Sequence, residues 1–296
     1  MTVLNRRDVL RVATAGCAAV ACHPWLEAIA DEHQQSATTP RFLLGACDWS
    51  LGKRHDPAAF SVAREIGLDG VEVSFGEPGG QHDLRDAQVL ATYHQTARDT
   101  QQRIASLAMG QLNQVPYASD PRTEAWVRDA VDVMPRVGVQ VCLLAFFGNG
   151  DIQGDREKQD EVIRRLKRVA PRAEQAGVVL GIESWMNADE HLRIIHSVDS
   201  PSVRVYYDVA NMTERGYDVP GEIRRLGTEF ICQIHMKENG NLLGRGKVDF
   251  PRVKEAIEDI GYTGWLILEG ATVGGKSLVD CYRENRRFLR ELLDIG

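Results

Sequence analysis

From Phe42 onward, short apolar runs alternate with longer segments in which apolar residues recur at helical spacing. Parallel strands that are covered on both faces give continuous apolar runs, and amphipathic helices connect them. The pattern therefore predicts repeated strand–helix units. Eight runs of strand length are expected, at residues 42–47, 70–75, 104–109, 139–147, 178–183, 203–208, 230–235 and 265–269.

The segments between these runs carry helix start and stop signals. Residues 56–67, 120–138 and 155–177 each begin with Asp and end with Gly, the residue types preferred at the two ends of a helix. Eight units in succession without a linker predict an α/β protein with a single domain, a (β/α)8 TIM barrel over residues 41–296. A doubly wound dinucleotide-binding sheet is disfavoured, because no G-x-G-x-x-G follows the first run.

The first thirty residues have a different character. A basic segment is followed by a stretch of small apolar residues that is too short to span a bilayer. Arg6 and Arg7 resemble a twin-arginine (Tat) signal, and the A-x-A pattern at 28–30 is typical of a cleavage site. We therefore expect a signal peptide at 1–30, a polar tether at 31–40, export to the periplasm and no transmembrane helix.

Composition and charge narrow the class of partner. Hydrophobic residues make up 43% and charged residues 26% of the chain, as in a globular protein with a large core. The formal charge is -7; residues 1–30 hold three Arg against one Asp and one Glu, so the remainder carries -7 - 1 = -8. The basic residues are scattered among acids, which argues against a nucleic-acid partner.

The six cysteines show no C-x-x-C pair and no zinc-like spacing, so no disulfide framework is expected. Cys47, Cys142 and Cys232 lie in apolar runs, where cysteine usually behaves as a small buried hydrophobic residue. Cys22 ends the sequence AVAC, which leaves a lipid anchor as an alternative to release of the mature protein.

The last four apolar runs each end on a polar residue. Catalytic residues of TIM barrels lie at the carboxyl ends of the strands. Carboxylates that are gathered there would repel one another, whereas a divalent cation would neutralise them. Oxygen ligands with one imidazole favour Mn²⁺, with Mg²⁺, Co²⁺ and Zn²⁺ as alternatives. The four candidate ligands are Glu183, Asp208, His235 and Glu269.

Each candidate ligand also has a structural interpretation when it is taken alone. Asp208 could cap the segment that follows it, His235 could be a core histidine, and either glutamate could pair with an arginine. Four such residues on successive runs favour the metal site.

Around these residues the sequence resembles a known family. Four short segments are similar to the metal-binding strand ends of the xylose isomerase-like barrel superfamily: GIESW, YYDVAN, QIHMKE and LILEG. The intervals between the candidate ligands, 208 - 183 = 25, 235 - 208 = 27 and 269 - 235 = 34, are similar to those of ketose 3-epimerases and hydroxypyruvate isomerase-like proteins. The resemblance covers roughly residues 41–294.

The resemblance implies one divalent ion held by the four residues, with Glu183 and Glu269 as the proton-transfer partners. It also implies a substrate contact for Arg245, although its spacing from His235 is not that of the epimerases, and a plain loop arginine is the alternative. Trp49 and Trp185 could stack on a sugar, and Glu238 could instead hold His235 or Arg245 in place. Further candidates to line the pocket are Asp48, Glu72, Gln111, Asn113 and Lys237.

These features predict an isomerase or epimerase that acts on a sugar or keto-sugar by glutamate-mediated proton transfer through an enediolate. The resemblance associates a hydride shift with a second metal and extra carboxylates, which residues 209–220 do not clearly provide. The alternatives are a keto-glycoside lyase or hydratase, a non-catalytic sugar-binding protein, and a multi-zinc endonuclease, although EVSFG and LAMGQ lack the histidines that the endonuclease needs. Whether the chain forms a homo-oligomer stays open.

Overall fold

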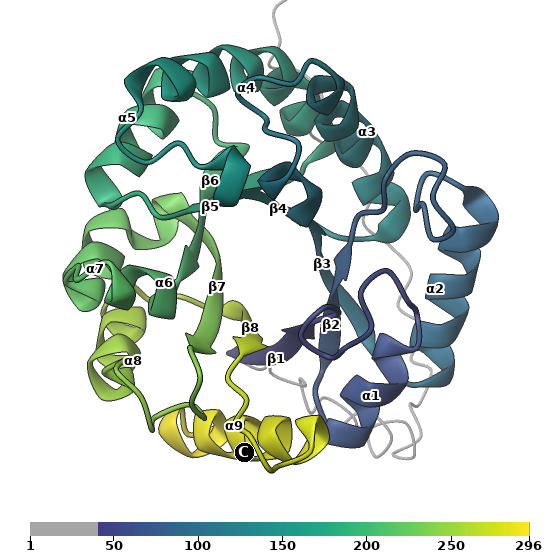
Figure 1. Cartoon of the computed structure of the whole chain (residues 1–296), viewed down its shortest axis with the longest axis vertical. Coiled ribbons are helices and arrows are strands. Elements are labelled where there is room, and N and C mark those ends of the chain that lie inside the picture. Colours follow the sequence, from purple (N-terminus) through teal and green to yellow (C-terminus); the bar gives the residue numbers. More distant parts are fainter. Residues whose placement is uncertain (1–40, 296) are drawn as a thin grey trace, which may run out of the picture. The chain divides into compact units, whose positions relative to one another are not determined.

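The computed structural model describes residues 41–295, so the predicted signal, cleavage site, tether and Cys22 lie outside the described residues. Eight parallel strands pair in chain order, and the last pairs with the first to close a barrel (Figure 1). The strands are β1 (Phe42–Cys47), β2 (Gly70–Ser74), β3 (Arg103–Met109), β4 (Val141–Phe146), β5 (Val179–Ser184), β6 (Val203–Asp208), β7 (Ile231–Glu238) and β8 (Gly264–Gly270).

The predicted TIM barrel is therefore confirmed, and the strand bounds agree with the expected ones to within three residues. The largest difference corrects one expectation: His235 is not the last residue of its strand, because β7 continues to Glu238. β8 makes this extension possible, since Lys237 pairs with Glu269 and Glu238 with Gly270.

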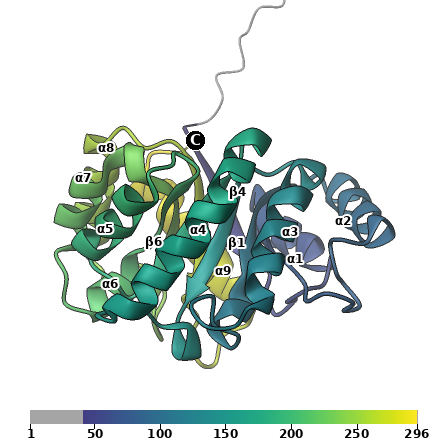
Figure 2. The ribbon, with the colours of Figure 1, turned by 90° about the horizontal axis from the view of Figure 1, so that it is seen from above.

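Helices surround the barrel and lie along the outside of the strands (Figures 1 and 2). Within residues 41–295, no helix is long and apolar enough to cross a membrane. The α-helices are α1 (Ala59–Ile66), α2 (Ala87–Asp99), α3 (Arg122–Val137), α4 (Arg156–Ala176), α5 (Ala188–Val198), α6 (Val209–Glu214), α7 (Val219–Phe230), α8 (Phe250–Asp259) and α9 (Leu278–Leu292), with short 3-10 turns η1 (Gly110–Asn113) and η2 (Gly148–Gly150).

The helix signals read from the sequence act as expected at most ends. Asp155 caps α4 by accepting a hydrogen bond from the Lys158 amide, whereas Asp56 and Asp120 lie before the caps of α1 and α3 and bind the amides two residues on. The three predicted stop glycines all adopt the left-handed conformation at the ends of α1, α3 and α4: they are Gly67, Gly138 and Gly177.

Inside the barrel, polar side chains replace part of the expected apolar filling. Apolar residues pack between strands and helices in the main core, and the four cysteines of the described chain are free, as predicted. A smaller apolar group of Ala108, Leu143 and Ala145 lies inside the barrel around Tyr206. Several inward-facing residues are polar and fully or almost fully buried, namely Glu72, Ser106, Gln233 and His235.

Candidate metal centre

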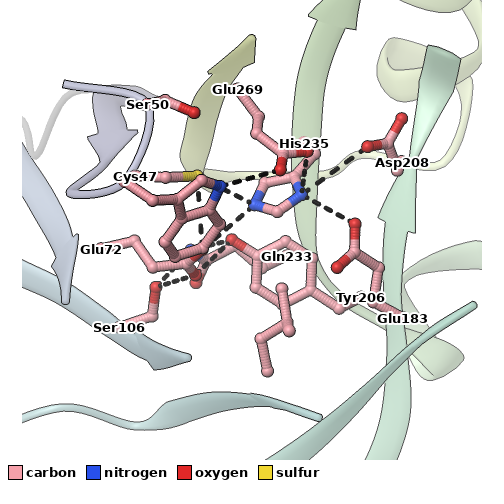
Figure 3. A network of polar contacts seen from close by, with 12 residues as sticks. Cys47, Ser50, Glu72, Ser106, Glu183, Tyr206, Asp208, Gln233, His235 and Glu269 are labelled. Carbon is pink, nitrogen blue, oxygen red and sulfur yellow. Dashed lines mark hydrogen bonds and ion pairs between the residues drawn. The ribbon is translucent and has the colours of Figure 1, made fainter. Parts of the chain in front are cut away.

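The four predicted ligands come from four successive strands and meet at the carboxyl end of the barrel. They are Glu183 on β5, Asp208 on β6, His235 on β7 and Glu269 on β8 (Figure 3). Each offers one ligand atom, and the four atoms lie within 4.8 Å of one another. The structure therefore brings together residues that are up to 86 positions apart, counted as 269 - 183.

His235 lies at the centre of this group and is fully buried. Its Nδ1 atom is 3.0 Å from Glu183 Oε1, 3.4 Å from Glu269 Oε2 and 3.8 Å from Asp208 Oδ2. The pairing of Asp208 with His235 between β6 and β7 sets two of these positions. One imidazole nitrogen thus faces three carboxylates.

Lys237 adds one positive charge to the same group. It lies two residues beyond His235 on β7, so its side chain points to the same face of the strand. Its Nζ atom is 2.9 Å from Glu269 Oε2 and 3.4 Å from Asp208 Oδ2. When His235 is neutral, as a metal ligand must be, the three carboxylates and one ammonium leave a net charge of -3 + 1 = -2, and the Glu72 carboxylate on the other side of the ring adds further negative charge.

The donor set fits a divalent cation. A charge of 2+ would offset most of this negative charge, and buried carboxylates require such compensation. Two buried oxygens of the group, Asp208 Oδ2 and Glu269 Oε2, meet no hydrogen-bond donor in suitable geometry. Both lie within 3.8 Å of Nδ1 of His235 and within 3.4 Å of the Lys237 ammonium, so these acceptor positions converge where an ion would bind.

The two oxygens of the Asp208 carboxylate are placed for different roles, one to cap a helix and the other to face the candidate metal site. Its Oδ1 atom accepts hydrogen bonds of 2.8 Å from the amides of Ala210 and Asn211 and so caps α6. The second oxygen, Oδ2, turns toward His235 and Lys237. Capping fixes the carboxylate plane and leaves one oxygen free for the site.

The protein groups shift the pKa values of the two glutamates in opposite directions. Burial raises the pKa of Glu183 to about 7. Burial also acts to raise the pKa of Glu269, but the charges of Lys237 and His235 outweigh it and lower this pKa to about 2. Carboxyl groups in such different surroundings are common in sites that move protons.

A pocket of about 310 Å³ opens beside the candidate ligands. Glu183 and Glu269 both line it. A small polar molecule would meet aromatic faces and a limited set of polar groups, the usual composition of a small-molecule site. The aromatic residues are Trp49, Phe147 and Trp185, and the main polar residues are Arg54, Gln111, Asn113, Asn211 and Lys237.

Of the six predicted substrate contacts, three line the pocket: Trp49, Gln111 and Trp185. Trp49 has a further role, because its indole Nε1 donates a 2.9 Å hydrogen bond to Glu269 Oε1. Lys237 approaches the other oxygen of this glutamate. Glu269 is therefore held on both sides by residues that also face the pocket.

The other three predicted contacts lie elsewhere, which corrects the sequence-based interpretation. Glu72 is fully buried beneath the pocket and contacts His235. Glu238 turns away and accepts hydrogen bonds from the amides of Lys247 and Val248, so it anchors the loop after β7. The Arg245 side chain is 68% exposed and lies near Glu284, in a separate small cleft beside α9.

Sequence reasoning missed several pocket residues. Four of them were not expected there, because the path of the chain in the closed barrel decides whether their side chains face the pocket. These residues are Arg54, Ser74, Phe147 and Asn211. A signal existed for Asn211: it follows Asp208 by three residues in a helical segment, a spacing that places both on one face. Its Oδ1 atom accepts a 3.3 Å hydrogen bond from Lys237.

Sequence comparison finds relatives that are sugar epimerases by name. An L-ribulose-5-phosphate 3-epimerase of Salmonella heidelberg (strain SL476) is 28% identical over 228 residues, which cover 71% of this chain and 80% of that protein. A D-psicose 3-epimerase of Ruminiclostridium cellulolyticum is 32% identical over 138 residues, 42% of this chain and 46% of that protein.

A solved structure and a family description extend the comparison over most of the barrel. The crystal structure of a D-psicose 3-epimerase in the presence of D-fructose superposes with a TM-score of 0.71 and 18% sequence identity, covering 85% of this chain and 99% of that one. The family described as xylose isomerase-like TIM barrel matches residues 60–292. The chain belongs to the xylose isomerase-like TIM barrel family.

Proposed function

We propose that this protein is a divalent-metal-dependent isomerase or epimerase that acts on a sugar or keto-sugar by proton transfer. One observation carries the proposal: Glu183 and Glu269, from the non-adjacent strands β5 and β8, both face one pocket and both approach Nδ1 of His235. The matching relatives are sugar epimerases by name, which supports the same class of substrate.

Glu183, Asp208, His235 and Glu269 would hold the ion. Mn²⁺ is our first choice because the set offers three carboxylates and one imidazole, with no thiolate. When bound, the ion would polarise the substrate carbonyl and stabilise negative charge on its oxygen.

The two glutamates would move the proton. One carboxylate accepts the hydrogen, as a proton, from the carbon next to the carbonyl, and the electron pair of that bond forms the enediolate. The other glutamate, which has taken a proton from water beforehand, delivers it to the opposite face of the same carbon, which epimerises it, or to the former carbonyl carbon, which isomerises the sugar. Trp49 and Lys237 hold Glu269 in place for this step through contacts of 2.9 Å each.

Proton transfer is favoured over a hydride shift by the residues after β6. A hydride shift would call for further carboxylates near the site, and residues 209–220 offer Glu214 and Asp218. Both are exposed, and neither belongs to a possible metal-binding group within residues 41–295.

Turnover in heavy water tests this proposal. The metal-stripped protein is reloaded with Mn²⁺ and incubated with free ketoses, phosphorylated ketoses and 3-keto-glycosides, and the products are analysed by mass spectrometry and NMR. We expect a product with solvent deuterium at the reacting carbon. A product in which the original hydrogen has moved intact would replace the mechanism with a hydride shift.

The same panel separates the alternatives. An unsaturated product from a keto-glycoside would favour the lyase interpretation, since proton abstraction next to a carbonyl also initiates elimination. Stoichiometric metal with no turnover of any sugar would favour a non-catalytic sugar-binding protein.

We also propose that the protein is exported through its N-terminal twin-arginine segment. The support is Arg6 and Arg7 ahead of a short apolar stretch. Changing both to Lys should retain the protein inside the cell, as measured by fractionation. Unchanged appearance of the mature protein outside the inner membrane would contradict this route.

A further inference from the structure

We infer that Glu72 is a positioning residue that fixes the tautomer of His235, so that the lone pair of Nδ1 faces the metal centre. The inference rests on the proposed metal site. Glu72 belongs to β2, is fully buried and contacts none of the three carboxylate ligands by a hydrogen bond within the described chain. Its Oε1 atom is 3.1 Å from Nε2 of His235, on the side of the ring opposite the site (Figure 3).

The other carboxylate oxygen of Glu72, Oε2, accepts hydrogen bonds from two hydroxyl groups whose direction is set by Gln233. The Gln233 amide donates to Ser106 Oγ at 2.9 Å and to the Tyr206 hydroxyl oxygen at 2.8 Å. Both hydroxyls are therefore free to donate onward, and both point to Glu72 Oε2, at 2.6 and 2.7 Å. Gln233 thus orients two hydroxyl protons toward one carboxylate oxygen.

The remaining oxygen of Glu72 then determines which imidazole nitrogen carries the proton. The Cys47 thiol lies 3.5 Å from Oε1 and 3.4 Å from Nε2, and burial raises its pKa, so it keeps its proton and donates to the carboxylate. A carboxylate can only accept, so at 3.1 Å Nε2 of His235 must be the donor to Oε1. A neutral imidazole with its proton on Nε2 has its lone pair on Nδ1. Nδ1 is the nitrogen that faces Glu183, Asp208 and Glu269.

The barrel makes room for this network. A Cβ atom at position 181 of β5 would lie 2.7 Å from Cys232 Sγ and 3.1 Å from Tyr206 Cβ. Glycine at this position therefore leaves space for the Tyr206 side chain. The Tyr206 ring then packs 4.5 Å from the His235 ring, measured between centroids, and its hydroxyl reaches Glu72. Burying the Glu72 carboxylate costs free energy that an apolar side chain at this position would not cost. The hydrogen bond that Glu72 accepts from His235 gives a reason for a carboxylate here.

The isosteric change Glu72→Gln tests the inference. The new amide oxygen would remain the acceptor for the Ser106 and Tyr206 hydroxyls, and its NH₂ group would face Nε2. Nε2 would then accept, and the imidazole proton would move to Nδ1, where it competes with the ion. We expect Mn²⁺ affinity to fall about tenfold to a hundredfold, the usual effect of losing such a partner.

Calorimetric titration of the metal-stripped protein measures this change without any substrate. The matched control is Asp48→Asn: Asp48 is another buried carboxylate in the first half of the barrel, and it binds Ser74 and the His55 amide instead of a candidate ligand. Its metal affinity should stay unchanged. Circular dichroism checks that each variant is folded.

A second measurement reads the tautomer directly. In the Zn²⁺-loaded protein with ¹⁵N-labelled histidine, His235 should carry its proton on Nε2 and its metal on Nδ1. A proton on Nδ1, or Glu72→Gln with wild-type affinity, would overturn the inference. If Glu72→Gln does not fold, Tyr206→Phe removes one donor to Glu72 and keeps the ring, and unchanged affinity in that variant would overturn it as well.

The outcomes separate this inference from the proposed function. A wild-type protein that binds no divalent ion contradicts the metal-dependent enzyme. A wild-type protein that binds the ion, beside a Glu72→Gln variant that binds it equally well, contradicts only the role of Glu72.

Discussion

The two halves of the barrel contribute to the site in different ways. β5 to β8 supply all four candidate ligands and Lys237. β1 to β4 and the loops after them supply pocket walls, among them Trp49 and Gln111, and the buried Glu72 that supports His235 from below. The second half thus presents the candidate ligands, and the first half adds pocket walls and the carboxylate that contacts Nε2 of His235.

This difference shows which functional residues can be predicted from their position in the sequence. In the second half, acids and a histidine stand at or near the ends of apolar runs, so their position alone marks them. Glu72 also stands in an apolar run, but its partners Ser106, Tyr206 and His235 are 34, 134 and 163 residues away in sequence. Its role depends on the closed barrel.

The largest expected effect comes from removing a ligand in the second half. Asp208→Ala or His235→Ala should abolish bound metal and activity, because each removes a donor from a four-donor set. The barrel should remain folded, with a loss of about 1 kcal/mol in the aspartate variant from the missing α6 cap. Elemental analysis and circular dichroism measure the two properties.

The control for these variants is Glu222→Gln. Glu222 is a half-buried carboxylate on α7 that binds the Ala188 amide and the Tyr207 hydroxyl, away from the ligand group. It should keep its metal. Full metal content and activity in both alanine variants would show that the four-residue site is wrong.

The next effect concerns the two glutamates. Glu183→Gln and Glu269→Gln keep an oxygen that can bind a metal but remove the ability to accept a proton. Each should lower kcat by about a hundredfold to ten-thousandfold, the usual contribution of a positioned base. Kinetics on the substrate identified in heavy water measure this loss, and a variant with the wild-type rate would remove that glutamate from the mechanism.

A smaller effect is expected where the first half supports the second. Trp49→Phe keeps an aromatic face but removes the hydrogen bond to Glu269 Oε1. We expect kcat to fall about tenfold, which corresponds to about 1.4 kcal/mol. Trp185→Phe is the control, because the Trp185 side chain lines the pocket without such a bond to a glutamate. Equal rates in the two variants would contradict the positioning role of Trp49.

The last effect is on stability alone and belongs to Asp48, a first-half carboxylate that serves structure. Burial raises its pKa from 3.8 to about 6. Between these values the folded protein binds a proton that the unfolded chain releases, so the free energy of unfolding should fall as pH rises from about 4 to 6, by up to about 3 kcal/mol. Asp48→Asn should lack this component. Urea unfolding at several pH values measures it, and parallel curves would contradict it.

The sequence was sufficient for the fold and for the four candidate ligands that the barrel brings together. Continuous apolar runs and glycine stops define the strand–helix units, and the positions of the four candidate ligands mark the carboxyl ends of the last four strands. The sequence was insufficient where side-chain direction decides the role: Arg245 lies outside the pocket, and Glu238 turns toward its own loop. Arg54 faces the pocket from a loop whose path the local pattern does not specify.

Metal stoichiometry of the purified protein tests the central claim most directly. The metal-stripped chain should bind one divalent ion, Mn²⁺ by preference, and His235→Ala should bind none, as measured by calorimetry and elemental analysis on the same samples. A wild-type protein that binds no ion, or one that binds a stoichiometric ion with His235 removed, would contradict the account.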